Sequence, residues 1–240
     1  MRSLVAAIRF LSRFPIPAIH GTTEDLARSI CWFPVVGLLI GGFLALLWHI
    51  GTLISPWVGA LLGLWAWVWS SGALHLDGLG DVTDAAGAAH KGPERIHAVL
   101  KDPHIGSFGV IAICLQLLSK LVLLHELAYR GTGIILTLAL IPAVARLGPL
   151  VWAHSLRPMH EGLGSLFSAA VTPRLLVFWG ILWMAATWLQ PAFVMTPAII
   201  LLWHHHLRKT FKGINGDGFG AGIEIMETLL LLAAISFPLG

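Results

Sequence analysis

Three aspartates lie close together in the segment HLDGLGDVTDA at residues 75–85. The spacings between Asp77, Asp81 and Asp84 place their carboxylates within about 60° of one another on a helix. Carboxylates on one face repel each other unless a cation neutralises them, and their hard oxygen donors suit Mg²⁺, Mn²⁺ or Ca²⁺. The pattern predicts a divalent-metal site; an exposed acidic loop is the alternative interpretation.

A second acidic segment, NGDGFGAGIEIMET at residues 215–228, is rich in glycine. Asp217 lies in the predicted turn, and Glu224 follows seven residues later, on the same helical face. Glycines allow a backbone to approach a phosphate closely. We predict that Asp217 and Glu224 add ligands to the metal site, although a GDG sequence alone is typical of an ordinary turn.

Polar residues in two other connections are candidates for substrate binding. The segment KDPHIGSFG at 101–109 combines Lys101, Asp102 and His104 with glycines, which suits phosphate binding. A polar connector of this composition also needs no function. Glu161 lies in the segment HEGLG at 160–164 and is a further candidate.

Two cations, Lys120 and Arg146, lie inside apolar segments. Intramembrane cations are rare and usually face a cavity or an acidic partner. We therefore predict that both contact substrate, with Glu126 as a candidate structural partner for one of them.

These residues suit the transfer of a phosphoryl-linked group. Metal ions and cations neutralise a diphosphate, while a carboxylate accepts a proton from the attacking hydroxyl. The predicted catalytic residues are Asp77, Asp81, Lys101 and Asp217.

The elements that position these residues are predicted to be membrane helices. Of 240 residues, 57% are hydrophobic and 11% charged, whereas soluble domains carry about 25% charged residues. Spans must be helical because a backbone in lipid satisfies its own hydrogen bonds. The prediction is a single all-α integral membrane domain over 1–240.

Apolar runs lie at 31–54, 57–74, 106–128, 133–154, 175–189, 192–206 and 219–238. Because the pair around Gln190 could form one hairpin or re-entrant segment, the count is six or seven.

The basic residues predict the orientation of the chain in a cell inner membrane. With the N-terminus inside, 12 of the 15 Lys and Arg residues face the cytoplasm, as the positive-inside rule requires. They are Arg2, Arg9, Arg13, Arg28, Lys91, Arg95, Lys101, Arg157, Arg174, Arg208, Lys209 and Lys212. The predicted site therefore faces the cytoplasm.

The first residues predict a short amphipathic helix. Arg2, Arg9 and Arg13 share one helical face, with apolar residues gathered elsewhere. Such a helix either lies in the headgroup plane or packs on the helical bundle. Pro15 and Pro17 are expected to end it.

The motifs resemble those of the cobalamin synthase family, the membrane-bound adenosylcobinamide-GDP ribazoletransferases. The matching segments follow the family's order over nearly the whole chain. They are RFLSRFPIP at 9–17, FPVVGLLIGG at 33–42, HLDGLGDVTDA at 75–85, KDPHIGSFG at 101–109, EGLG at 161–164 and GDGFGAGIEIMETLLL at 216–231. The aspartate segment is specific, whereas the apolar segments are not.

The resemblance implies a Mg²⁺-dependent reaction. A ribose hydroxyl of α-ribazole, or of its 5′-phosphate, attacks the corrinoid-side phosphorus of adenosylcobinamide-GDP. GMP leaves, and adenosylcobalamin or its 5′-phosphate forms. The resemblance implies Asp77, Asp81 and Asp84 as metal ligands. Further positions that match the family are Lys101, Asp102, Lys120, Arg146, Asp217 and Glu224.

This chain departs from the family pattern at two places. The family usually has Lys-Asp-Ser-Arg where residues 101–104 read KDPH, which puts an arginine contact to phosphate in doubt. It often has threonine after the last-motif aspartate, where Gly218 stands here. Neither departure touches the three aspartates at 77, 81 and 84.

Two other functions remain as alternatives. CDP-alcohol phosphotransferases also use membrane aspartates, but Asp77-Gly78 lacks their following Ala-Arg and later paired aspartates. A cation transporter would favour ligands near the bilayer midplane and two related halves, and consecutive histidines at 204–206 point to different helix faces. The basic residues form no stripe, so no nucleic-acid partner is expected. Partners are the two substrates and the lipid bilayer, and a homo-oligomer is compatible with the sequence.

Overall fold

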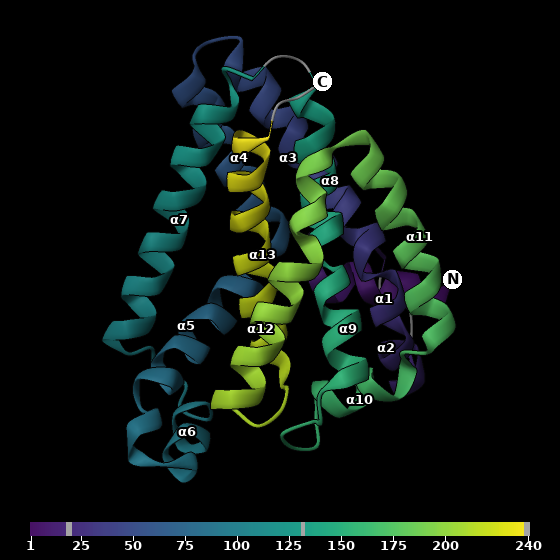
Figure 1. Cartoon of the computed structure of the whole chain (residues 1–240), viewed down its shortest axis with the longest axis vertical. Helices are drawn as coiled ribbons and strands as arrows, with labels where there is room; N and C mark the ends of the chain where they lie inside the picture. Colours follow the sequence, from purple (N-terminus) through teal and green to yellow (C-terminus); the bar gives the residue numbers. More distant parts are fainter. Residues whose placement is uncertain (18–20, 131–132, 238–240) are drawn as a thin grey trace.

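The computed structural model describes residues 1–17, 21–130 and 133–237, and it is a bundle of helices in which this part of the chain forms no strand (Figure 1). The all-α prediction is therefore confirmed. The helices are α1 (Arg2–Leu11), α2 (Thr23–Ser29), α3 (Phe33–Thr52), α4 (Pro56–Ser71), α5 (Leu74–Gly87), α6 (Pro93–Val99), α7 (Ser107–Leu127), α8 (Ile134–Ala145), α9 (Leu147–Ser155), α10 (Leu163–Ala170), α11 (Pro173–Leu189), α12 (Thr196–Thr210) and α13 (Gly216–Ser236).

Four helical segments among the described residues are long and apolar enough to cross a membrane: 23–52, 107–127, 134–155 and 216–236. Two further pairs, α4 with α5 and α10 with α11, qualify only together, and each pair is bent by 84°. The count is thus four to six, and six requires that each bent pair forms one span. The sixth predicted span, 192–206, overlaps α12, which has 15 residues and does not qualify.

Helix α13 lies at the centre of the bundle, against α5, α7 and α8 (Figure 1). Glycines at the contact with α5 let the two backbones approach closely. A β-carbon on Gly78 would lie 2.9 Å from the carbonyl oxygen of Asp217, and one on Gly220 would lie 3.2 Å from the Cα of His75. Small residues serve this purpose at helix contacts in membranes. The packing brings the aspartate helix α5 onto the first turns of α13.

A sharp corner separates α4 from α5. Gly72 and Ala73 are both left-handed, with φ of 60° and 59°. This conformation is unfavourable for alanine by about 1–2 kcal/mol, so the surrounding structure must enforce it. The corner ends the predicted 57–74 span at Ser71 and lets the aspartates begin a helix of their own.

Helix α1 is amphipathic, as predicted, and its apolar face packs on the bundle. Ala7 and Leu11 are buried, and the Phe10 ring lies 5.8 Å from that of Phe167. Arg9 and the following Arg13 are exposed. The helix ends at Leu11, before the predicted stop at Pro15. The structure therefore supports packing on the bundle, with the basic side outward.

Candidate functional site

Asp77 and Asp217 line the same cavity, although they are 140 positions apart in the sequence. The cavity has a volume of about 100 Å³ and lies between α5, the start of α13 and the phenylalanines of α1 and α10. Asn215 fixes Asp217: its Nδ2 donates to Asp217 Oδ2 at 2.8 Å, and its Oδ1 accepts from the Gly218 N–H at 2.9 Å. Asn215 thus caps α13 and orients the carboxylate at once.

Asp81 lies within electrostatic reach of Asp77, Asp84 and Asp217. Across the described ranges no Lys, Arg or His forms an ion pair with Asp77, Asp81 or Asp217. These three residues are called the acidic cluster below. The predicted convergence of the last aspartate motif on the α5 aspartates is therefore present in the fold.

The acidic cluster does not enclose a metal ion as it stands. Within the described part of the chain, no three His, Cys, Asp or Glu side chains are grouped closely enough to hold one. Mg²⁺, however, usually keeps several waters and binds one or two carboxylates together with substrate phosphates. A hard divalent cation bound in this way would take one or two of the carboxylates of Asp77, Asp81 and Asp217, together with substrate phosphates.

Asp84 has a structural role that the sequence did not reveal. Its two carboxylate oxygens accept hydrogen bonds from the Gly106 N–H at 2.7 Å and the Gly109 N–H at 3.0 Å. These donors belong to the start of α7, where an acidic cap is favourable. A β-carbon on Gly106 would lie 2.5 Å from Asp84 Oδ1, so glycine permits this approach. Asp84 ties the 101–109 segment to α5.

The predicted phosphate-binding residues Lys101, Asp102 and His104 are exposed and do not line the cavity. His104 donates two hydrogen bonds to Asp102 Oδ1, from the backbone N–H at 3.0 Å and from Nδ1 at 2.8 Å. These bonds hold the pKa of Asp102 below its usual value. Lys101 and His104 belong to the segment that Asp84 ties to α5, but they lie outside the acidic cluster.

The connection before α10 lies beside the start of α13. The Met159 N–H donates to the Ile214 carbonyl at 3.0 Å, and the Ile214 N–H donates to the Arg157 carbonyl at 2.9 Å. This pairing brings His160 within electrostatic reach of Asp217. Glu161, the predicted substrate contact, is exposed next to it.

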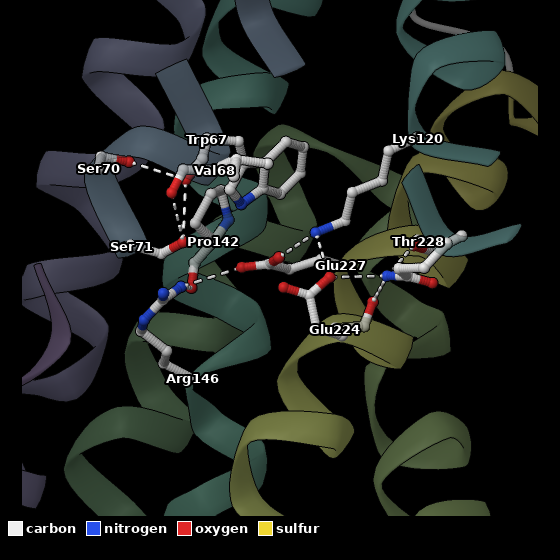
Figure 2. Close-up of polar contacts among 11 residues, drawn as sticks. Trp67, Val68, Ser70, Ser71, Lys120, Pro142, Arg146, Glu224, Glu227 and Thr228 are labelled. Atoms are coloured by element: carbon white, nitrogen blue, oxygen red, sulfur yellow. Dashed lines mark hydrogen bonds and ion pairs between the residues drawn. The ribbon is translucent and has the colours of Figure 1, made fainter. Parts of the chain in front are cut away.

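A buried ionic network lies deeper in the bundle (Figure 2). Lys120 Nζ is 2.7 Å from Glu224 Oε2 and 2.6 Å from Glu227 Oε2. Arg146 Nη1 is 3.1 Å from Glu227 Oε1. All four side chains are at most 4% exposed, and Lys120 also lies 4.2 Å from the centre of the Trp67 ring. Two cations and two anions balance one another within the bundle.

The network changes the interpretation of four predicted residues. Lys120 and Arg146 were predicted to contact substrate and Glu224 to bind metal, but the structure places them together, away from the acidic cluster. Glu126 as the partner of a buried cation was wrong: it is exposed, with Oε1 3.3 Å from His125 Nδ1. The partner that the sequence analysis missed is Glu227. The sequence carried a signal for it, because Glu227 is a second acid three residues after Glu224 in an apolar helix that contains no cation.

His75 lies between the cavity and the network. It lines the cavity, is within electrostatic reach of Arg146 and Lys120, and its buried Nε2 has no hydrogen-bond partner among the described residues. The histidine of the HLDGL motif is therefore close to both the cavity and the ionic network.

The fold and site define a polytopic helical membrane protein whose acidic cluster has no ion-pair partner among the described residues. A family model described as cobalamin-5-phosphate synthase matches residues 3–235, and the chain belongs to that family. It is 51% identical to an adenosylcobinamide-GDP ribazoletransferase of Novosphingobium aromaticivorans over 97% of this chain and 96% of that protein. Proteins of the same name from Laribacter hongkongensis and Brevibacillus brevis are 47% and 34% identical, each over 98% of this chain and 97% and 98% of their own lengths. No solved structure matches the chain.

Proposed function

We propose that this protein joins adenosylcobinamide-GDP to α-ribazole, or to its 5′-phosphate, and releases GMP. The observation that carries the proposal is the convergence of Asp77 and Asp217 on one cavity, in a chain whose full-length relatives bear the name of this activity. A transporter or a phospholipid synthase is not favoured by these relatives.

The acidic cluster supplies two functions in this reaction. Asp77, Asp81 and Asp217 would hold Mg²⁺, which supplies positive charge against the diphosphate when it is bound. A carboxylate of the same cluster accepts the proton of the attacking ribose hydroxyl, and Asn215 keeps Asp217 directed into the cavity for that purpose. The exposed Lys101 is a second candidate contact for phosphate oxygens.

The activity is expected to depend on a divalent cation. Purified protein in detergent, incubated with adenosylcobinamide-GDP, α-ribazole and Mg²⁺, should form a cobamide and release GMP. Exhaustive chelation should abolish both, and Mg²⁺ or Mn²⁺ should restore them, because repelling carboxylates need a counter-charge to bind a diphosphate. Full turnover after chelation would contradict the metal site, and no turnover with the metal present would contradict the proposed function.

We also propose that the site faces the cytoplasm of an inner-membrane protein. Figure 1 places α5, α6 and the segment before α13 at one end of the bundle, and the basic residues of the connections favour that end as the inner side.

A cysteine at the exposed His97 of α6 should therefore react with a membrane-impermeant thiol reagent only in inside-out vesicles. Cys31 and Cys114 are free cysteines, and Cys114 is exposed, so both are first replaced by serine. Labelling of the His97→Cys protein in intact cells would reverse the orientation.

A further inference from the structure

A second, larger cavity adjoins the acidic cluster from the side of α1. It has a volume of about 440 Å³ and is lined by Arg9, Ser12 and Arg13 from the end of α1, by the α4–α5 corner, and by Asp77. We call it the arginine pocket. Its size falls within the range of about 300–1,000 Å³ that is usual for small-molecule sites. Asp77 lines both cavities, so the arginine pocket adjoins the proposed reaction site.

The corner between α4 and α5 positions Arg13. The Arg13 N–H donates to the Ser70 carbonyl at 2.8 Å, which fixes the backbone at the rim of the pocket. The Arg13 side chain lies where a β-carbon on Gly72 would stand. Glycine at this left-handed position therefore both makes the turn and leaves room for the guanidinium stem. No ion pair in the described chain involves Arg13.

The start of α5 adds to the positive character of this pocket. Leu74, the first residue of α5, lines it, and the N-cap residue Ala73 has no side chain that could cap the first turn. The free N–H groups of a first turn carry a positive partial charge that favours anions. Ala73 is held in an unfavourable conformation immediately before this turn, as is common for residues at ligand sites.

We propose that the arginine pocket binds a phosphoryl group of a substrate and holds it beside Asp77. Guanidinium groups form two parallel hydrogen bonds to phosphate, and Arg13 presents such a group beside an open helix start. The inference rests on the proposed function and deepens it. The phosphate belongs either to the diphosphate of adenosylcobinamide-GDP or to α-ribazole 5′-phosphate, and the arms of the experiment distinguish them.

The test compares Arg13→Gln with the matched control Arg2→Gln, which replaces an exposed arginine of α1 outside the pocket. Both proteins are placed in phosphatidylcholine nanodiscs, and KM and kcat are measured with α-ribazole and with its 5′-phosphate. Binding of adenosylcobinamide-GDP and of inorganic pyrophosphate is measured separately by calorimetry in the presence of Mg²⁺ and without the acceptor. Melting temperature reports folding, and Arg13→Lys retains the charge without the two-pronged contact.

Arg13→Gln should weaken phosphate recognition by about 10- to 100-fold, as expected for the loss of hydrogen bonds to a charged group. Weaker binding of adenosylcobinamide-GDP and pyrophosphate assigns the pocket to the diphosphate. A higher KM for α-ribazole 5′-phosphate alone assigns it to the 5′-phosphate. Arg13→Lys should fall between wild type and Arg13→Gln, with Arg2→Gln unchanged.

Three results would overturn the inference: equal losses in Arg13→Gln and Arg2→Gln, no change in any affinity, or an effect that appears only when anionic lipid is added, which would indicate a headgroup contact. If the wild-type protein turns over neither acceptor, the proposed function fails instead. The pyrophosphate measurement then still decides whether the arginine pocket binds phosphate.

Discussion

Replacing Asp81 by asparagine is expected to lower the rate of GMP release at least about a hundredfold, the scale on which the loss of a metal ligand or of a preorganised charge acts. The carboxylate of Asp81 forms no hydrogen bond or ion pair with another described residue. Asp84 accepts two backbone hydrogen bonds, whereas Asp81 lies among three other carboxylates. An amide is a poorer metal ligand and leaves the charge of the cation less compensated.

Stability should respond in the opposite direction. Because Asp81 faces carboxylates and no cation, the Asp81→Asn protein without metal should melt at the same temperature as wild type or slightly higher. Asp81→Glu keeps the charge but moves it by one methylene, so partial activity with an altered metal preference is expected. Glu94→Gln is the matched control, because it removes an exposed acid from α6 outside the acidic cluster.

The measurement is GMP release across a Mg²⁺ titration, with melting temperatures recorded with and without the metal. Near wild-type turnover of Asp81→Asn with an unchanged Mg²⁺ dependence would remove Asp81 from the metal site. Equal losses in Asp81→Asn and Glu94→Gln would indicate a general effect of charge at this end of the bundle.

The sequence predicted the features that depend on local spacing. The one-sided row of Asp77, Asp81 and Asp84 became helix α5, because helical periodicity is set by neighbouring residues. The bend before α5 was not predictable, because Ala73 adopts a left-handed conformation that its residue type disfavours. As a result, α4 and α5 form a pair bent by 84°, whereas the sequence predicted a span that continues to residue 74.

Contacts between residues far apart in the sequence could not be predicted either. The partners of Asp84 lie 22 and 25 residues away, and Glu227 lies 107 residues from Lys120. Lys120 and Arg146 were correctly identified as unusual, because cations are rare in membrane segments. That rarity does not distinguish a substrate contact from an internal ion pair. Only the packing of α7 and α8 on α13 shows that two anions already face these cations.

The second large effect expected is a loss of stability on replacing Glu227 by glutamine. Glu227 is the only residue that pairs with both buried cations in the described chain. Removing its charge leaves Lys120 and Arg146 with Glu224 alone, and breaking a buried pair in this way costs about 3–5 kcal/mol. The free energy of unfolding in mixed detergent micelles measures the loss. Glu126→Gln is the control, since this exposed acid contacts only His125 and should change stability by less than about 1 kcal/mol.

A compensating substitution separates charge balance from side-chain packing. Adding Arg146→Met to Glu227→Gln removes one cation with one anion and leaves Lys120 and Glu224, which are 2.7 Å apart, as the charged pair. Part of the lost stability should return, because fewer buried charges remain unpaired. The double variant should also retain the wild-type KM for both substrates, since the network lies apart from the acidic cluster. If Lys120→Met alone raises KM for adenosylcobinamide-GDP tenfold or more at unchanged stability, Lys120 is a substrate contact and the ion pairs belong to the unliganded state only.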